Sequence, residues 1–116
     1  MGWSLRQWET EVTDFLAVIG KGGEARVLRD LRAMTALGHL FRGDTRSLGG
    51  GLIELRVRHC GMAYRLIYVH HDNTAVFLVC FEKKKQKTPK DKLDLAKSRY
   101  SSLLRQEVQI GNIAFN

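Results

Sequence analysis

Hydrophobic positions in the first third of the chain recur with a helical period. The segment 10–20, "TEVTDFLAVIG", places apolar residues three and four positions apart, and the segment 24–40, "EARVLRDLRAMTALGHL", repeats that spacing. A glycine-rich link at 20–23 separates them, and Gly38 is suited to end the second helix. The pattern predicts an N-terminal helical hairpin whose apolar stripe covers a sheet.

The middle of the chain changes to the period of strands. Segment 52–58, "LIELRVR", alternates apolar and charged residues, while segments 64–70 and 75–83 are rich in β-branched and aromatic residues. Their short links suit antiparallel hairpins. The glycine run 49–51 is expected to be a flexible connector. We therefore expect a meander, with one face covered by the helical hairpin and the other partly open.

The remaining segments carry weaker or later signals. Segment 2–8, "GWSLRQW", is a poorly periodic candidate for a further edge strand, which a partner could complete. Thr88 and Pro89 are typical of a helix start, with threonine as the cap and proline at the first helical position. An apolar stripe at helical spacing follows them, formed by Leu93, Ala96, Tyr100, Leu103 and Leu104. The sequence thus predicts an α+β class fold: an N-terminal helical hairpin packed on an antiparallel β-meander of three to four strands, followed by a C-terminal helix. It predicts a single domain over 1–116, with a loosely ordered tail at 108–116.

Charge narrows the kind of partner. The 116 residues include 19 lysines and arginines against 12 acids, a formal net charge of +7. The excess is local, because the window 81–92 holds six lysines and only Glu82 and Asp91 as acids. Such a surface attracts polyanions, so nucleic acid or an acidic protein is the expected partner.

Other features bear on location. Two cysteines cannot form the disulfide frame of a small secreted domain, and the first residues lack the pattern of a signal peptide. No apolar run approaches the roughly 20 residues of a membrane helix. We expect a cytoplasmic protein with free thiols and no membrane association.

Arg65 is the first candidate for chemistry. An arginine between Tyr64 and Leu66 in a half-buried strand is costly unless its charge meets an anion. That anion is either the carboxylate of Glu54 or a phosphate. Because Arg56, Arg58 and the lysine run exceed the neighbouring acids, a phosphate would supply the missing negative charge.

Metal chemistry has little support in the sequence. The strands carry only Glu54 and Glu82 as acids, too few to hold two catalytic metals, and the histidines and cysteines lack zinc-site spacing. We expect no metal and no cofactor. RNA can be cleaved without metal, since its own 2′-OH attacks the adjacent phosphate when a base accepts the proton. Neighbouring positive charges lower a lysine's pKa, so Lys84 or a neighbour could be that base, although the same residues could bind without cutting.

Three motifs in fixed order carry a family resemblance. "SLGGGLIELRVRHCGMAYRLIY" (47–68), "FEKKKQKTP" (81–89) and "LDLAKSRY" (93–100) resemble the HigB-like, phage-derived branch of the RelE/ParE toxin superfamily. The resemblance implies the toxin of a type II toxin-antitoxin system: a metal-independent endoribonuclease that cleaves mRNA, usually at the ribosome. It also implies a cognate antitoxin with a helix-turn-helix domain that neutralises the toxin.

The resemblance also assigns roles to positions. Arg65 and Lys84 correspond to catalytic or phosphate-binding positions, and Arg56, Gln86 and Lys87 to the rest of the motifs. Strand parity adds Arg58 as a phosphate ligand. The lysine run adds Lys83 and Lys85 as RNA-binding residues.

The resemblance leaves the general base undefined. Ribosome-dependent relatives place lysines on the first strand of the meander, where this chain has Leu52 and Glu54. Tyr68 and His59 are the alternative acid/base candidates. A second hypothesis is therefore a non-enzymatic toxin that binds a protein target, as gyrase inhibitors on this fold do. A third is a plain nucleic-acid-binding or protein-binding module.

Overall fold

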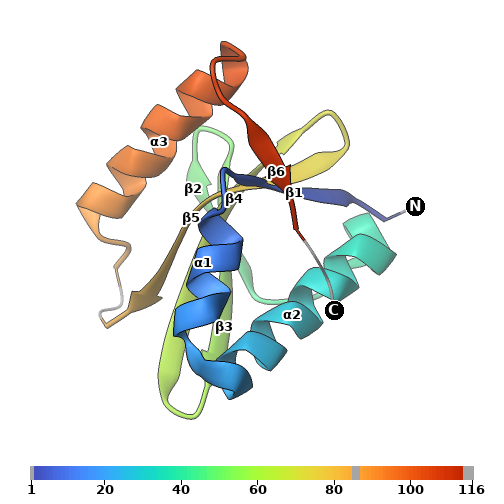
Figure 1. Ribbon diagram of the computed structural model, residues 1–116, viewed down its shortest axis with the longest axis vertical. Helices are drawn as coiled ribbons and strands as arrows, with labels where there is room; N and C mark the ends of the chain where they lie inside the picture. The colour runs from blue at the N-terminus through green and yellow to red at the C-terminus, as the bar shows by residue number, and fades with distance from the viewer. Residues whose placement is uncertain (1, 85–86, 114–116) are drawn as a thin grey trace.

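A computed structural model describes residues 2–84 and 87–113, which form a mixed sheet with helices on both faces (Figure 1). Within these residues the sheet has six strands in the order β2-β3-β4-β5-β1-β6. The elements are β1 (Ser4–Trp8), α1 (Glu11–Val18), α2 (Gly20–Leu37), a 3-10 turn (Gly38–Leu40), β2 (Thr45–Gly49), β3 (Leu52–His59), β4 (Met62–His71), β5 (Thr74–Lys83), α3 (Lys90–Leu104) and β6 (Ile110–Asn112). The predicted α+β class is confirmed, although the sheet is larger than the predicted meander.

Tight turns join β2, β3, β4 and β5 in sequence. Cys60-Gly61 and Asp72-Asn73 have positive φ, as two-residue hairpin turns require. The glycine run is also a turn, because Gly49, Gly50 and Gly51 have φ of 88°, 61° and 90° and connect β2 to β3. The run is thus a connector, as expected, and the connection is a hairpin turn between two paired strands.

The N-terminal segment lies inside the sheet, not at its edge. β1 pairs in parallel with β5 and antiparallel with β6. Its poor periodicity has a physical cause in Gln7, which is buried yet polar. Gln7 Oε1 accepts hydrogen bonds from the amides of Val12 and Thr13 at the start of α1, and its Nε2 donates to the Asn112 carbonyl. A glutamine that caps a helix thus stands where the pattern would have placed an apolar residue. β6 lies within the tail that was predicted to be loosely ordered.

The two N-terminal helices meet at a single residue. Only Ile19 separates α1 from α2, and Gly20, with φ of 85°, makes the change of direction. The later glycines belong to α2 itself. A Cβ at Gly23 would lie 2.8 Å from the Tyr64 hydroxyl, so glycine permits this helix to approach the sheet. In Figure 1 the two helices diverge from this junction.

Both faces of the sheet carry a core. Buried side chains of α1 and α2 pack on one face with Leu55, Leu66 and Phe77. Side chains of α3 pack on the other face with Ile67 and Leu78. The prediction of one partly open face is therefore wrong where α3 lies. No helix in the described ranges combines the length and the apolar character needed to cross a bilayer.

Candidate functional site

Cationic side chains gather on the α3 face of the sheet, at the end where β5 stops. The register places Arg46 opposite Glu54, Arg56 opposite Arg65, and Lys83 opposite Ala63. Directly paired residues and residues two positions apart share a face. Four strands thus contribute Arg46, Glu54, Arg56, Arg65 and Lys83 to one surface, which we call the cationic face.

At its centre lies a buried ion pair. Arg65 Nε is 3.4 Å from Glu54 Oε1, and the two side chains are 5% and 0% exposed. The other carboxylate oxygen, Oε2, accepts a hydrogen bond of 2.7 Å from the Thr88 hydroxyl. Of the two anions considered for Arg65, the Glu54 carboxylate is the one in contact. The junction between β5 and α3 reaches the pair through Thr88.

Hydrogen bonding within this pair is incomplete. Among the described residues, Arg65 Nε, Arg65 Nη1 and Glu54 Oε1 are buried without a hydrogen-bond partner. Buried polar atoms in proteins are nearly always hydrogen-bonded, and each exception costs about 1–3 kcal/mol. Glu54 therefore neutralises the charge of Arg65, while Arg65 Nε and Nη1 donate no hydrogen bond to any described residue.

Burial and like charge perturb the two innermost cations. Burial lowers the pKa of the Arg65 guanidinium, an effect opposed by Glu54 and reinforced by Arg56. Burial also lowers the pKa of Lys83, which is 6% exposed; Arg65 adds to this effect and Glu54 opposes it. An arginine keeps its charge in spite of such a shift, whereas a lysine can lose its proton.

Arg56 and Arg58 differ in their surroundings. Arg56 is half-buried and donates through Nε and Nη2 to Asp44 Oδ1, at 3.2 and 3.0 Å. Arg58 is exposed near the end of β3 and lines a small hollow of about 220 Å³ beside His59 and Cys60. The structure therefore leaves Arg58 more accessible to an external anion than Arg56.

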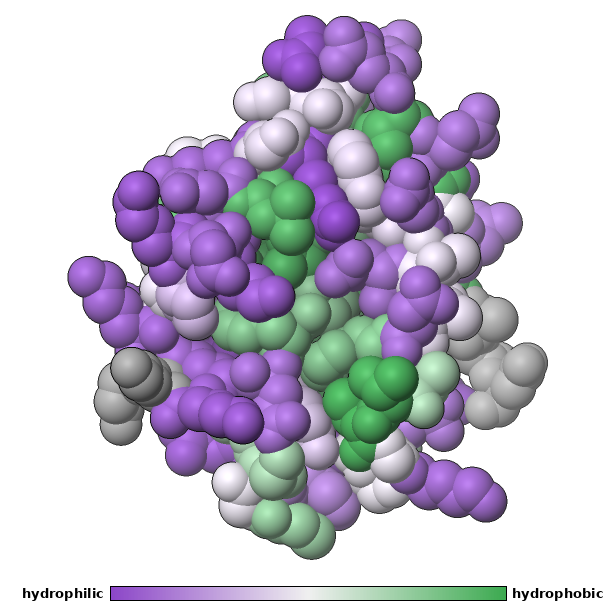
Figure 2. All heavy atoms as spheres, turned by 60° about the vertical axis from the view of Figure 1, so that its left-hand side comes forward, coloured by the Kyte–Doolittle hydropathy of each residue, from purple (hydrophilic) through white to green (hydrophobic). Residues whose placement is uncertain are grey.

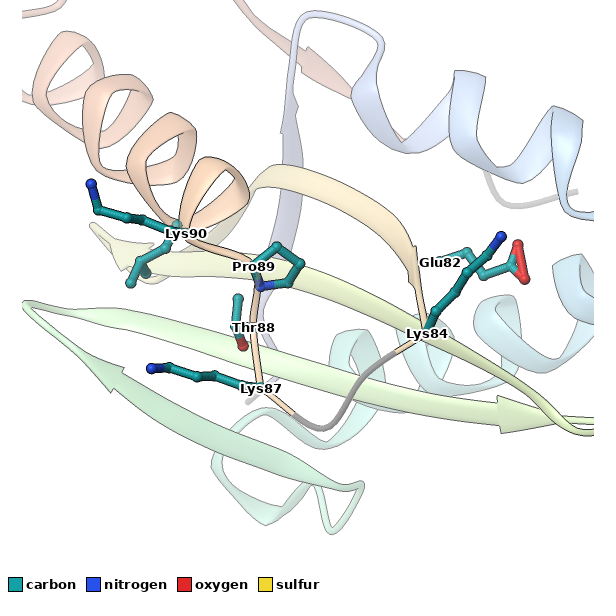
Figure 3. Close-up of a pocket in the computed structure, with 7 residues that line it drawn as sticks. Glu82, Lys84, Lys87, Thr88, Pro89 and Lys90 are labelled. Carbon is teal, nitrogen blue, oxygen red and sulfur yellow. The ribbon is translucent and has the colours of Figure 1, made fainter.

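The lysine-rich junction lines a separate hollow of about 710 Å³ between β5 and α3. Glu82, Lys84, Lys87, Thr88, Pro89, Lys90 and Leu93 line it. Figure 3 shows the Lys84 and Glu82 side chains on one side and Lys87 directed to the other. Lys85 and Gln86, two of the predicted RNA-binding residues, lie outside the described residues.

Figure 2, in which the left-hand side of Figure 1 comes forward, displays a mainly hydrophilic surface broken by hydrophobic patches.

The alternative acid/base residues lie on the other face of the sheet. Tyr68 is buried against Phe77 and His70 on the side of α1 and α2, and burial raises its pKa. His59 lies beside α2 at Gly22, and its Nε2 is 3.4 Å from Cys60 Sγ. The structure does not bring either residue to Arg65. No group of three or more His, Cys, Asp or Glu side chains in the described ranges is arranged to hold a metal ion.

Two contributors to the site escaped the sequence analysis. Arg46 lies on β2, and interpreting the glycine run as a hairpin turn would have placed it opposite Glu54. Thr88 was predicted to cap α3, yet α3 starts at Lys90 with Pro89 as its cap position and no side-chain cap. The Thr88 hydroxyl binds Glu54 instead, and nothing in a Thr-Pro pair signals that choice.

A comparison of the sequence with known protein families identifies the family of this chain. Residues 14–101 match the family described as phage derived protein Gp49-like (DUF891). The chain belongs to the Gp49-like family. This is a RelE-like, toxin-related family, and membership is compatible with the toxin of a toxin-antitoxin pair. The Gp49-like match includes the whole cationic face, which is Arg46, Glu54, Arg56, Arg65 and Lys83, and also Thr88. No curated protein matches the chain.

Proposed function

We propose that this Gp49-like protein is the HigB-like toxin of a type II toxin-antitoxin system and cleaves messenger RNA as a metal-independent endoribonuclease. One observation carries the proposal. Arg65 is buried on the cationic face with two nitrogen atoms that have no hydrogen-bond partner among the described residues. Nε lies towards Glu54 and does not form a fork with Nη1, so in this proposal Nη1 is the nitrogen that donates to a phosphodiester oxygen.

The surrounding charges support a backbone ligand. Arg46 and Arg58 are exposed on the same face, and Lys84 and Lys87 extend the positive charge along the junction. In this proposal they bind phosphates that flank the scissile one. Lys85 and Gln86 belong to the same motif and are proposed to do the same. Contacts of this kind position RNA without selecting its bases.

The proposed reaction uses the 2′-OH of the substrate as nucleophile. Arg65 would stabilise the charge that develops on the phosphorus oxygens, a contribution that preorganised donors supply in a water-poor site. Glu54 and Thr88 hold the guanidinium in place before RNA arrives. Cleavage would leave a 2′,3′-cyclic phosphate and a free 5′-OH.

The test is cleavage in cells and with purified protein. Pulsed expression should arrest growth and create new 5′ ends in messenger RNA, mapped by primer extension. An Arg65→Lys variant should reduce cleavage by about 10²-fold or more, the effect of losing a transition-state donor. Cleavage by a folded variant at the wild-type rate would remove Arg65 from the centre of the site.

A non-enzymatic toxin is the second candidate, and one observation favours it. Tyr68 and His59 lie across the sheet from Arg65, so neither alternative acid/base faces the cationic side. A toxin that binds a protein target, such as gyrase, needs no proton acceptor. Growth arrest without new RNA ends, accompanied by loss of supercoiling activity, would select this candidate.

A cognate antitoxin is the proposed protein partner. Family membership is compatible with such a pair, and the resemblance to HigB-like toxins suggests a helix-turn-helix protein. Co-expression of the adjacent reading frame should relieve growth arrest, and the two proteins should co-purify. Ribosome involvement is tested separately, by comparing cleavage of free and translated messenger RNA.

A further inference from the structure

Two adjacent lysines at the end of β5 occupy different environments. Lys83 is the last residue of β5 and is 6% exposed, whereas Lys84 follows the strand and is exposed. The register pairs Lys83 with Ala63 and Phe81 with Arg65, so Lys83 and Arg65 share the cationic face. Lys84 instead projects beside Glu82 (Figure 3). Glu82 pairs with Tyr64, which belongs to the face that α1 and α2 cover.

Several of the charged groups that act on Lys83 come from three neighbouring strands. Arg65 of β4, Glu54 and Arg56 of β3, and Arg46 of β2 all act on it electrostatically. Three of these four are cations, so they favour the neutral amine over the ammonium. Burial acts in the same direction and is the larger cause. The Thr88 hydroxyl donates a hydrogen bond to the Glu54 carboxylate on the same face.

We infer that Lys83, and not Lys84, accepts the proton from the 2′-OH in the proposed cleavage. The inference rests on the proposed ribonuclease function and replaces its least defined part, the general base. It differs from the assignment by motif position, which selects Lys84. The geometry favours Lys83 because it combines burial, a shared face with Arg65 and a surrounding that disfavours its charged form.

The step balances without a co-reactant. The neutral Nζ of Lys83 takes the 2′ proton, and the 2′ oxygen forms a bond to phosphorus. The bond between phosphorus and the 5′ oxygen breaks, and that oxygen takes a proton from water. Lys83 then returns its proton to solvent. Arg65 remains charged throughout and neutralises the phosphoryl oxygens.

Replacing Lys83 by arginine distinguishes a role as general base from a role as a positive charge alone. Lys83→Arg keeps the positive charge but cannot become neutral. We expect Lys83→Arg and Lys83→Gln each to lower kcat by about 10²–10⁴-fold, the usual contribution of a general base. Lys84→Arg and Lys84→Gln should act mainly on KM. Lys21→Gln, which removes the same charge from α2, serves as the control for net charge.

The pH profile supplies the decisive readout. For wild type, kcat/KM should rise with pH until Lys83 is neutral, and the Lys84 variants should keep that rise. Loss of the rise in Lys83→Arg supports the inference. Wild-type kcat with an unchanged profile in Lys83→Arg overturns it, as does loss of the rise in Lys84→Arg. If the wild-type protein cleaves no RNA, the proposed function fails and this inference fails with it.

A direct measurement guards against misfolded variants. An NMR titration of the side-chain amines in the wild-type protein should identify Lys83 as the lysine with the lowest pKa, assigned by its disappearance in Lys83→Arg. A Lys83 that titrates with the exposed lysines would overturn the inference without any activity assay.

Discussion

Two arginine–glutamate pairs link separate parts of this molecule, and they differ in how completely they are hydrogen-bonded. Arg99 of α3 donates to Glu11 of α1 at 2.8 Å and to the Leu78 carbonyl, and its guanidinium lies 5.2 Å from the Trp8 ring centre. Glu11 also accepts the Cys80 amide at 2.9 Å. Both Glu11 oxygens accept hydrogen bonds and Arg99 Nη1 donates two, although both side chains are about one-fifth exposed.

The second pair, Arg65 and Glu54, is more deeply buried but less satisfied. Its closest approach is 3.4 Å, and among the described residues three of its polar atoms have no hydrogen-bond partner. The β1–β5 pairing ends at Phe77, and the first pair then binds the Leu78 carbonyl and the Cys80 amide of β5. Its role is therefore structural. Incomplete hydrogen bonding in the deeper pair costs stability, and in the proposed function a phosphate ligand would supply the missing acceptor for Arg65.

The largest expected effect follows from breaking the deeper pair. Glu54→Leu leaves the Arg65 charge buried without a counterion and should lower the free energy of unfolding by about 3–5 kcal/mol. Urea denaturation monitored by circular dichroism measures it. A loss below about 1 kcal/mol would mean that Arg65 reaches solvent when Glu54 is removed.

Replacing both partners should recover most of that loss. The double variant Glu54→Leu with Arg65→Met removes both charges, and its unfolding free energy should return to within about 1–2 kcal/mol of wild type. RNA binding, measured by fluorescence anisotropy with a labelled oligonucleotide, should nevertheless fall. Wild-type RNA affinity in a stable double variant would show that the pair is purely structural.

The satisfied pair should show a smaller effect on stability and none on RNA. Arg99→Lys keeps the charge but loses the two hydrogen bonds that Nη1 donates to Glu11 and Leu78, which should lower the unfolding free energy by about 1–2 kcal/mol. RNA affinity of this variant should match wild type. A decrease comparable to that of the Arg65 variants would contradict the division between the two pairs.

Salt dependence sharpens the comparison further. Each lysine that neutralises a phosphate contributes about 0.7 to the slope of log affinity against log salt for single strands. Lys87→Gln should reduce the slope by roughly that amount, whereas Arg99→Lys should leave it unchanged. Equal slopes for wild type and Lys87→Gln would place Lys87 outside the RNA interface.

The smallest expected effect is the pH dependence of stability that Lys83 causes. Folding lowers its pKa below the ordinary value of 10.5. Between the folded value and 10.5 the unfolded state binds more protons, so the unfolding free energy should rise with pH in that window. Lys83→Met should flatten this rise in urea titrations on the alkaline side. An unchanged slope would show that Lys83 keeps its ordinary pKa.

Sequence patterns predicted the central strands well and the outer ones poorly. The segments 52–58, 64–70 and 75–83 are all strands in the structure. The first was indicated by its alternating pattern, and the other two by β-branched and aromatic runs that match burial on both faces. β2 and β6 were missed, since they are short and hold polar residues and glycines. β1 was misplaced at an edge because Gln7 interrupts its apolar pattern for a tertiary reason, the capping of α1.

The site was predicted in part for similar reasons. Arg65 was singled out by its apolar neighbours, and Glu54 was one of its two expected partners. The choice between Lys83 and Lys84 needs the register of β5 against β4, which no local pattern contains. Arg46 needs the β2–β3 pairing, and Thr88 needs the path of the junction over β3.

The position of β1 in the sheet also affects when the chain can complete its folding during translation. Ser4 lies opposite Thr74 and Arg6 opposite Asn112, so the first strand to leave the ribosome finds neither neighbour until much of the chain has been translated. Contacts so distant along the chain slow folding. Since β5 also carries Lys83, the cationic face should be completed only late in biosynthesis.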